Sequence, residues 1–166
     1  MRIAWAAVTA GLMGAAVGAM HAATRLDRLH VRTDAAWAAL DAALYRRAVV
    51  ASVVHGYGAL RHAAHAALLA GLSAREEVEN ELGRALSALD RGSLEPACAG
   101  RLADAEQAVV IARRVYNDAV RDTLALRSRR LVRWLRLAGT APLPRYFEIV
   151  EPALPAYGFE LDGAGA

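Results

Sequence analysis

The sequence predicts an all-α protein, in which an N-terminal transmembrane helix continues into an elongated up-and-down bundle of three to four helices. Three observations predict it. Alanine and arginine, which favour helices, are abundant, and long alternating β-branched runs typical of strands are missing. Apolar residues recur at steps of three and four positions through most of the chain. No proline precedes Pro96, so the run that begins at Ile3 stays compatible with a helix to about Ala70.

Length and charge limit the class of protein. With 166 residues the chain is long enough for one domain with a modest core. The net charge of +3 is mild, and no nucleic-acid-binding module accompanies it, so we expect no nucleic-acid partner. The single cysteine, Cys98, excludes an intramolecular disulfide and a cysteine-based zinc site. No catalytic constellation is recognisable, so we expect no enzyme activity and no cofactor.

Residues 1–25 are predicted to be a transmembrane anchor. No formally charged side chain lies between Arg2 and Arg25, and a helix needs roughly 20 residues to cross a bilayer. A signal peptide is the rival interpretation, but the stretch exceeds the usual signal core of about 7–15 residues, and no clean Ala-x-Ala site precedes Thr24. More arginines follow the segment than precede it, which predicts a single-pass protein of the cell membrane with its bundle on the cytoplasmic side.

Gly14 and Gly18 form a Gly-x-x-x-Gly pair within this segment. Such a pair lets two helix backbones approach closely in lipid, and would support a homo-oligomer. A segment rich in alanine and glycine also produces this spacing by chance, so helix–helix contact and coincidence both remain open.

Residues 26–138 are predicted to form the bundle, and its first helix carries one apolar stripe. Gly56 and Gly58 each cost a helix about 1 kcal/mol relative to alanine, which places a bend or a break near Tyr57. We expect a continuous or merely bent rod. The stripe comprises Leu26, Leu29, Thr33, Trp37, Leu40, Leu44, Ala48 and Ala51.

Three histidines follow at helical spacing. His55, His62 and His65 can share one face of a continuous helix, where they would form a metal-binding or pH-sensing stripe. No carboxylate stands at ligand spacing between them, and no His-Glu-x-x-His motif is present. We therefore favour three surface or interface histidines and assign no metal ligand.

Two further helices are predicted between Gly71 and Leu137. Ser73 and Glu76 fit a capping box at the start of the first, and Pro96 fits the first turn of the second. The apolar face of the first comprises Val78, Leu82, Leu86 and Leu89. That of the second comprises Leu102, Ala105, Val109, Ala112, Tyr116, Ala119 and Thr123.

The end of the last helix carries a basic cluster with one tryptophan: Arg129, Arg130, Arg133 and Trp134. A solvated face is one interpretation, and contact with anionic lipid headgroups or a partner is the other. If the first helix breaks near Gly56, four helices alternate in direction and the cluster returns to the membrane. If it does not break, three helices alternate and the cluster points into the cytoplasm.

Three motifs of the chain are similar, in content and in order, to those of one known family. Residues 36–41 read Ala-Trp-Ala-Ala-Leu-Asp and precede an arginine pair at 46–47; residues 112–117 read Ala-Arg-Arg-Val-Tyr-Asn and follow Glu106; residues 145–148 read Arg-Tyr-Phe-Glu. Their order matches that of the LemA family, and the chain resembles a divergent member of it. The resemblance implies one membrane helix with a helical bundle and an uncharacterised cellular role, and it supplies no catalytic residue.

The residues of these motifs also make sense as packing. Trp37 fits a core between helices, and a buried Tyr116 hydroxyl or Asn117 amide must find a hydrogen-bond partner. Asp41 is expected to form an ion pair within the bundle. The candidates for its partner are Arg46, Arg47 and Arg113.

Residues 139–166 are predicted to be an irregular C-terminal tail, because prolines and a terminal Gly-Ala repeat dominate them. Tyr146, Phe147, Tyr157 and Phe159 would pin this tail to the bundle or dock a partner. The whole pattern predicts a membrane-anchored adaptor or scaffold that binds an unknown protein partner. The alternative is a helical protein secreted after signal cleavage, which binds a metal or a small ligand through the histidine face.

Overall fold

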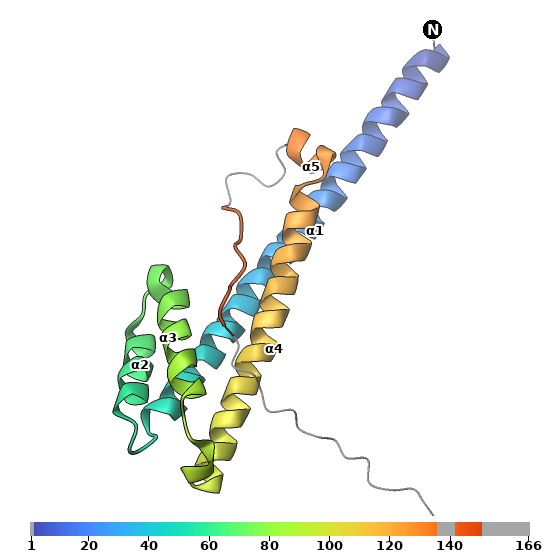
Figure 1. The fold of residues 1–166 in the computed structure, drawn as a ribbon. Coiled ribbons are helices and arrows are strands. Elements are labelled where there is room, and N and C mark those ends of the chain that lie inside the picture. The colour runs from blue at the N-terminus through green and yellow to red at the C-terminus, as the bar shows by residue number, and fades with distance from the viewer. Residues whose placement is uncertain (1, 136–141, 151–166) are drawn as a thin grey trace, which may run out of the picture.

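The computed structural model describes residues 2–135 and 142–150, except for the side chains at positions 2–4, 6–8, 10, 12 and 131. The prediction of an all-α protein is confirmed. Figure 1 shows the arrangement of its helices. They are α1 (Arg2–Ser52), α2 (Gly58–Leu69), α3 (Arg75–Ser87), α4 (Pro96–Arg127) and α5 (Arg130–Trp134), with 3-10 turns η1 (Leu72–Ala74) and η2 (Arg91–Ser93).

The four longer helices alternate in direction (Figure 1). Helix α4 runs back along α1, and these two helices make the most extensive contact in the fold. Helices α2 and α3 form a hairpin against the C-terminal part of α1. The N-terminal part of α1 projects beyond α5, away from the rest of the bundle.

The expectation of a continuous first rod was wrong, because α1 ends at Ser52 and α2 begins at Gly58. Residues 53–57 form the turn between them, and Gly56 has a φ of +85°. Only glycine adopts this left-handed conformation without a steric cost. The reversal here, rather than a bend, makes α2 antiparallel to α1 and gives the fold four alternating helices.

The last long helix also ends earlier than predicted, at Arg127 instead of about Leu137. Pro96 does stand in its first turn, as expected. After Ser128 and Arg129 the chain resumes as α5, where Val132 is buried against α1 and α4.

The capping box predicted at Ser73 and Glu76 was also wrong. The 3-10 turn η1 occupies residues 72–74, so α3 begins at Arg75 and no side chain caps it. Glu76 is therefore already inside the helix, and its carboxylate accepts a hydrogen bond from the backbone N–H of Glu148 instead.

The core consists of three apolar clusters along α1, and the predicted stripes supply most of its residues. The lower cluster joins all four long helices around Ala51, Leu60, Leu82, Leu86 and Leu102. The middle cluster joins α1 and α4 to the C-terminal segment, residues 142–150. It is built around Leu40, Leu44, Val120, Phe147 and Ile149. The upper cluster comprises Leu26, Leu126 and Val132.

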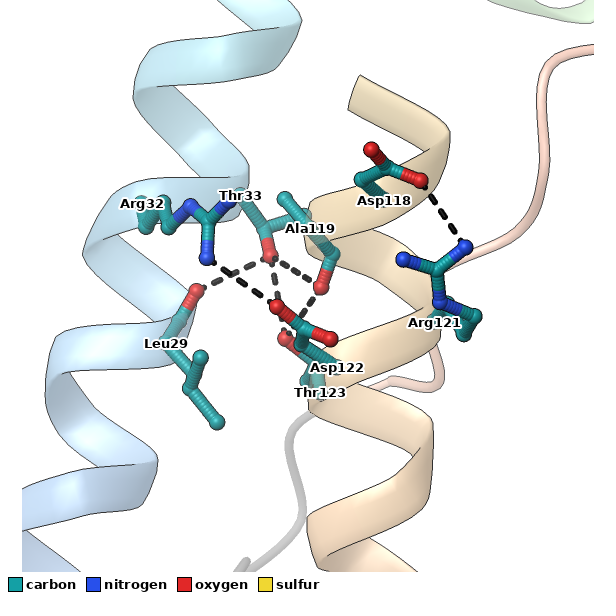
Figure 2. Close-up of polar contacts among 8 residues, drawn as sticks. All are labelled: Leu29, Arg32, Thr33, Asp118, Ala119, Arg121, Asp122 and Thr123. Carbon is teal, nitrogen blue, oxygen red and sulfur yellow. Dashed lines mark hydrogen bonds and ion pairs between the residues drawn. The ribbon is translucent and has the colours of Figure 1, made fainter. Parts of the chain in front are cut away.

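A polar layer separates the upper cluster from the middle one, and Figure 2 shows its contacts. The Thr33 and Thr123 hydroxyls lie 3.1 Å apart across the α1–α4 contact. Thr123 donates to the Ala119 carbonyl at 2.9 Å, and Thr33 lies 2.9 Å from the Leu29 carbonyl. Because each hydroxyl has a single proton and an acceptor carbonyl on its own helix, at most one of the two can donate across the contact at a time.

Replacing Thr33 with valine is expected to lower the free energy of unfolding by about 1 kcal/mol, because it removes one buried hydrogen-bonding group. The double replacement Thr33→Val and Thr123→Val is expected to cost less than the sum of the single ones, since each single replacement already removes the contact between the two hydroxyls. Chemical unfolding followed by circular dichroism measures both. Strictly additive losses would contradict a direct coupling. Asp122→Ala, which removes an exposed ion pair with Arg32, is the control and should change stability by at most about 1 kcal/mol.

Candidate functional site

The projecting part of α1 exposes large apolar side chains. Trp5, Met13 and Met20 are 68–72% exposed, and Leu26 is the first buried residue along the helix among those whose side chains are described. Residues 13–17 are exposed without interruption, so the rest of the described chain leaves more than one full turn of the helix largely uncovered. Large apolar side chains that are exposed together are typical of a lipid environment or of a surface that another protein covers.

Within the residues that the structure describes, no helix combines the length and the apolar character required of a membrane span.

The predicted glycine pair lies on this projecting part. A Cβ atom added at Gly14 or at Gly18 would meet no atom within 4 Å. Gly14 is exposed, whereas Gly18 lines a hollow of about 320 Å³ against Leu126 and Val132. The two glycines therefore leave room for a neighbour, and nothing in the described chain fills it.

The basic cluster lies at the base of the projecting part. Arg129, Arg130 and Arg133 are exposed, and Trp134 is 82% exposed. The buried Val132 holds α5 against Leu26. The break after Ser52 thus returns the cluster to the N-terminal end of the bundle, which is the four-helix alternative of the sequence prediction. We call these four exposed residues the basic shoulder.

Three residues of the family-like motifs meet in the middle of the bundle. The rings of Trp37 and Tyr116 have centroids 5.3 Å apart at 61°, and those of Trp37 and Phe147 lie 5.8 Å apart at 70°. These edge-to-face contacts stabilise aromatic pairs beyond the area that they bury. Tyr116 and Asn117 do find hydrogen-bond partners, as predicted, but both partners are backbone groups of the C-terminal segment.

Burial raises the pKa of the Tyr116 hydroxyl, and the nearby carboxylates of Asp34 and Glu76 raise it further. The neutral hydroxyl therefore remains available as a donor, and it donates to the Arg145 carbonyl at 2.9 Å. Beside it a hollow of about 620 Å³ is lined by residues of α1 together with Leu72 and Pro142–Pro144. The C-terminal segment thus covers the aromatic cluster incompletely.

The ion pair predicted between Asp41 and Arg46, Arg47 or Arg113 does not form. Asp41 contacts Arg75 of α3 at 2.8 Å rather than an arginine of α1 or α4. Arg47 instead contacts Glu79 at 2.6 Å, and Arg75 lies 3.2 Å from the other oxygen of the same carboxylate. Arg113 is half-buried on α4. Four charged residues thus join α1 to α3, and two of them, Arg47 and Glu79, are almost completely buried.

The pairing of two buried carboxylates, Glu79 and Glu106, with arginines was not predicted, although the sequence contains a signal for it. Glu79 precedes Leu82 and Leu86 by three and seven positions, so it falls on the buried stripe of α3. Glu106 stands next to the buried Ala105 and is itself buried, and Arg91 of η2 binds it through two contacts of 2.8 and 2.9 Å. A carboxylate at an apolar-stripe position predicts a partner of opposite charge.

The three histidines do not share one helix face. His55 lies in the turn at 53–57, whereas His62 and His65 are exposed on α2. Among the described residues, no group of three or more potential ligands is placed to hold a metal ion.

No family model, curated protein or solved structure matches this chain. The resemblance to the LemA family stays a prediction. The described part of the chain has three candidate binding surfaces. They are the projecting apolar part of α1, the basic shoulder at its base, and the surface of the bundle that the C-terminal segment covers.

Proposed function

We propose that this chain is a membrane-anchored helical adaptor or scaffold of the LemA type. In this proposal residues 1–25 insert into the cell membrane, the bundle lies on the cytoplasmic side, and the protein works through protein and membrane-surface contacts without chemistry of its own. One observation carries the proposal: the projecting apolar part of α1 ends at the basic shoulder.

The dimensions agree with this role. As an α-helix, the uncharged stretch between Arg2 and Arg25 is about 33 Å long, and the hydrocarbon core of a bilayer is about 30 Å thick. The side chains of Met13, Val17 and Met20, which are exposed in the isolated chain, would then contact lipid. Transfer of such groups from water to an apolar environment is favourable by about 25 cal/mol per Å².

The basic shoulder suits the level of the headgroups. Each arginine near an anionic membrane surface contributes about 1 kcal/mol to binding, and tryptophan prefers the interface between lipid and water. Arg129, Arg130 and Arg133 are exposed there, and Trp134 stands beside them. The arginines that closely follow the proposed anchor, Arg25, Arg28 and Arg32, favour the cytoplasmic side for the bundle.

Anchoring is tested by fractionation of cells that express the full chain with a C-terminal tag. We expect the tag to pellet with membranes, to resist a carbonate wash, and to be protected from protease in spheroplasts. The double variant Met13→Arg and Val17→Arg should be released, because each arginine costs about 2.5–3.5 kcal/mol at the centre of a bilayer. Val31→Arg is the matched control, since Val31 is exposed on the same helix beyond the proposed anchor.

Two results would contradict the proposal. Wild-type protein that the carbonate wash removes would exclude a membrane-inserted anchor. A pelleted tag that protease digests in spheroplasts would place the bundle on the outer side of the membrane.

A further inference from the structure

The part of the C-terminal segment from Arg145 to Val150, which we call the strap, runs between α3 and the α1–α4 pair (Figure 1). It contacts both sides, and we call the surface that it covers the groove. On the α4 side, the Asn117 carboxamide accepts from the Phe147 N–H at 2.9 Å and donates to the Phe147 carbonyl at 3.2 Å. It therefore binds the strap as a neighbouring β-strand would. Tyr116 adds the contact with the Arg145 carbonyl, two residues earlier on the same side of the strap.

The α3 side binds the opposite edge of the strap. The Glu148 N–H donates to Glu76 at 3.0 Å, and the Val150 N–H donates to the Asn80 carboxamide at 2.8 Å. Residues four apart on a helix are separated by about 6 Å along its axis, and residues two apart on an extended chain by about 6.6 Å. Glu76 and Asn80 thus match the repeat of the strap, and the groove contacts both edges of an extended main chain.

The side chains of the strap alternate between the groove and solvent. Phe147 and Ile149 are buried in the middle cluster, whereas Tyr146, Glu148 and Val150 are exposed. This alternation is that of a strand with one buried face. The floor of the groove therefore accepts two apolar side chains that stand two positions apart.

All the polar side chains in these contacts belong to the helices, and the strap supplies only backbone groups and two apolar side chains. Any extended segment can make the same contacts if it has apolar residues at two alternate positions and no proline at the three positions that donate. Recognition of an extended segment through its main chain, with pockets for alternate side chains, is an established mode of peptide binding.

We propose that this groove is a peptide-binding site, which the strap occupies within its own chain and which takes an extended segment of a partner protein. The segment carries an aromatic residue followed two positions later by a branched aliphatic residue, as Phe147 and Ile149 do. This inference deepens the proposed adaptor function and rests on it, because it names the surface by which the adaptor binds its partner. The strap competes with that partner for the groove and so lowers the apparent affinity of the groove for the partner segment.

The test uses the full chain with the double replacement Phe147→Ala and Ile149→Ala, which removes the apolar side chains of the strap and opens the groove. The probe is a fluorescent synthetic peptide with the sequence of residues 142–150. We expect saturable binding by the open variant and binding at least about tenfold weaker by the wild-type chain, in which the strap occupies the site. Fluorescence anisotropy measures both affinities.

Two controls separate groove binding from non-specific adsorption. Val150→Ala alters an exposed side chain of the strap and should leave the groove closed, with wild-type affinity for the peptide. Asn117→Ala, added to the open variant, should abolish binding of the peptide, because it removes both contacts with Phe147.

Three outcomes would overturn the inference. The open variant could keep its helical circular dichroism and not bind the peptide, or the peptide could still bind after Asn117→Ala is added. The open variant could also bind the strap of a second, wild-type chain but not the peptide. The last would make the groove a site of exchange between copies. None of these results depends on the membrane, so failure here leaves the fractionation test of anchoring unaffected.

Discussion

Replacing Glu79 with alanine is expected to lower the free energy of unfolding by about 3–5 kcal/mol. Arg47, which is 2% exposed, would lose its contact of 2.6 Å and remain buried without a carboxylate. Arg75 would lose the same carboxylate but keep Asp41. Chemical unfolding of the full chain, followed by circular dichroism, measures the change.

The loss should come from the arginine left behind rather than from the ion pair itself. Burial raises the pKa of the Glu79 carboxyl, although the charges of Arg47 and Arg75 oppose this rise. The ionised carboxylate is therefore no more stable in this site than in water. The double replacement Glu79→Leu and Arg47→Met, which removes both buried charges, is accordingly expected to recover most of the stability.

Glu81→Ala is the matched control for Glu79→Ala, because Glu81 stands on the same helix with a side chain that is half exposed and 4.0 Å from Arg84. Its removal should change stability by less than about 1 kcal/mol. A similarly small loss for Glu79→Ala would contradict the buried contact with Arg47.

Replacing Leu44 with alanine is expected to lower the free energy of unfolding by about 2–5 kcal/mol. Leu44 is completely buried in the middle cluster, where it packs with α4 residues and the strap. The substitution removes apolar contacts and leaves a cavity that surrounding helices can fill only in part. The same unfolding measurement applies, and faster hydrogen exchange at the Phe147 amide would report loosening of the strap.

Val31→Ala is the control for this prediction, since Val31 lies on the same helix and is largely exposed. It should change stability by no more than about 0.5 kcal/mol. Equal losses for Leu44→Ala and Val31→Ala would show that the α1–α4 contact does not form the core described.

The helices and their buried faces were largely predictable, because both follow from local periodicity. Leu40, Leu44 and Ala48 stand at steps of four along α1, and each is buried. Leu82 and Leu86 on α3 follow the same rule. The face of a helix on which a side chain lies depends only on the position of the residue in a repeat of 3.6 residues, so it can be predicted from the sequence.

The sites were less predictable, because each depends on which helices face one another. Trp37, Tyr116 and Asn117 were identified as packing residues that need partners, but the groove in which Tyr116 and Asn117 bind the strap was not foreseen. Phe147 was expected to pin the tail to the bundle or to dock a partner, but nothing near Asn117 in the sequence indicates Phe147, thirty residues later, as its partner. Glu76 was assigned to a cap for the same reason, since a local partner is the only one that a local pattern can suggest.

From its sequence alone, this chain is an all-α protein with an uncharged stretch between Arg2 and Arg25, apolar stripes on the long helices and a basic end to the last one. The tertiary structure decided that α1 stops at Ser52, that Glu79 pairs with Arg47, and that the strap fills the groove. Helical periodicity depends on residues that are close together in the chain. These three outcomes depend on contacts between residues that are far apart in the chain, and such contacts contribute to stability only after the helices have packed.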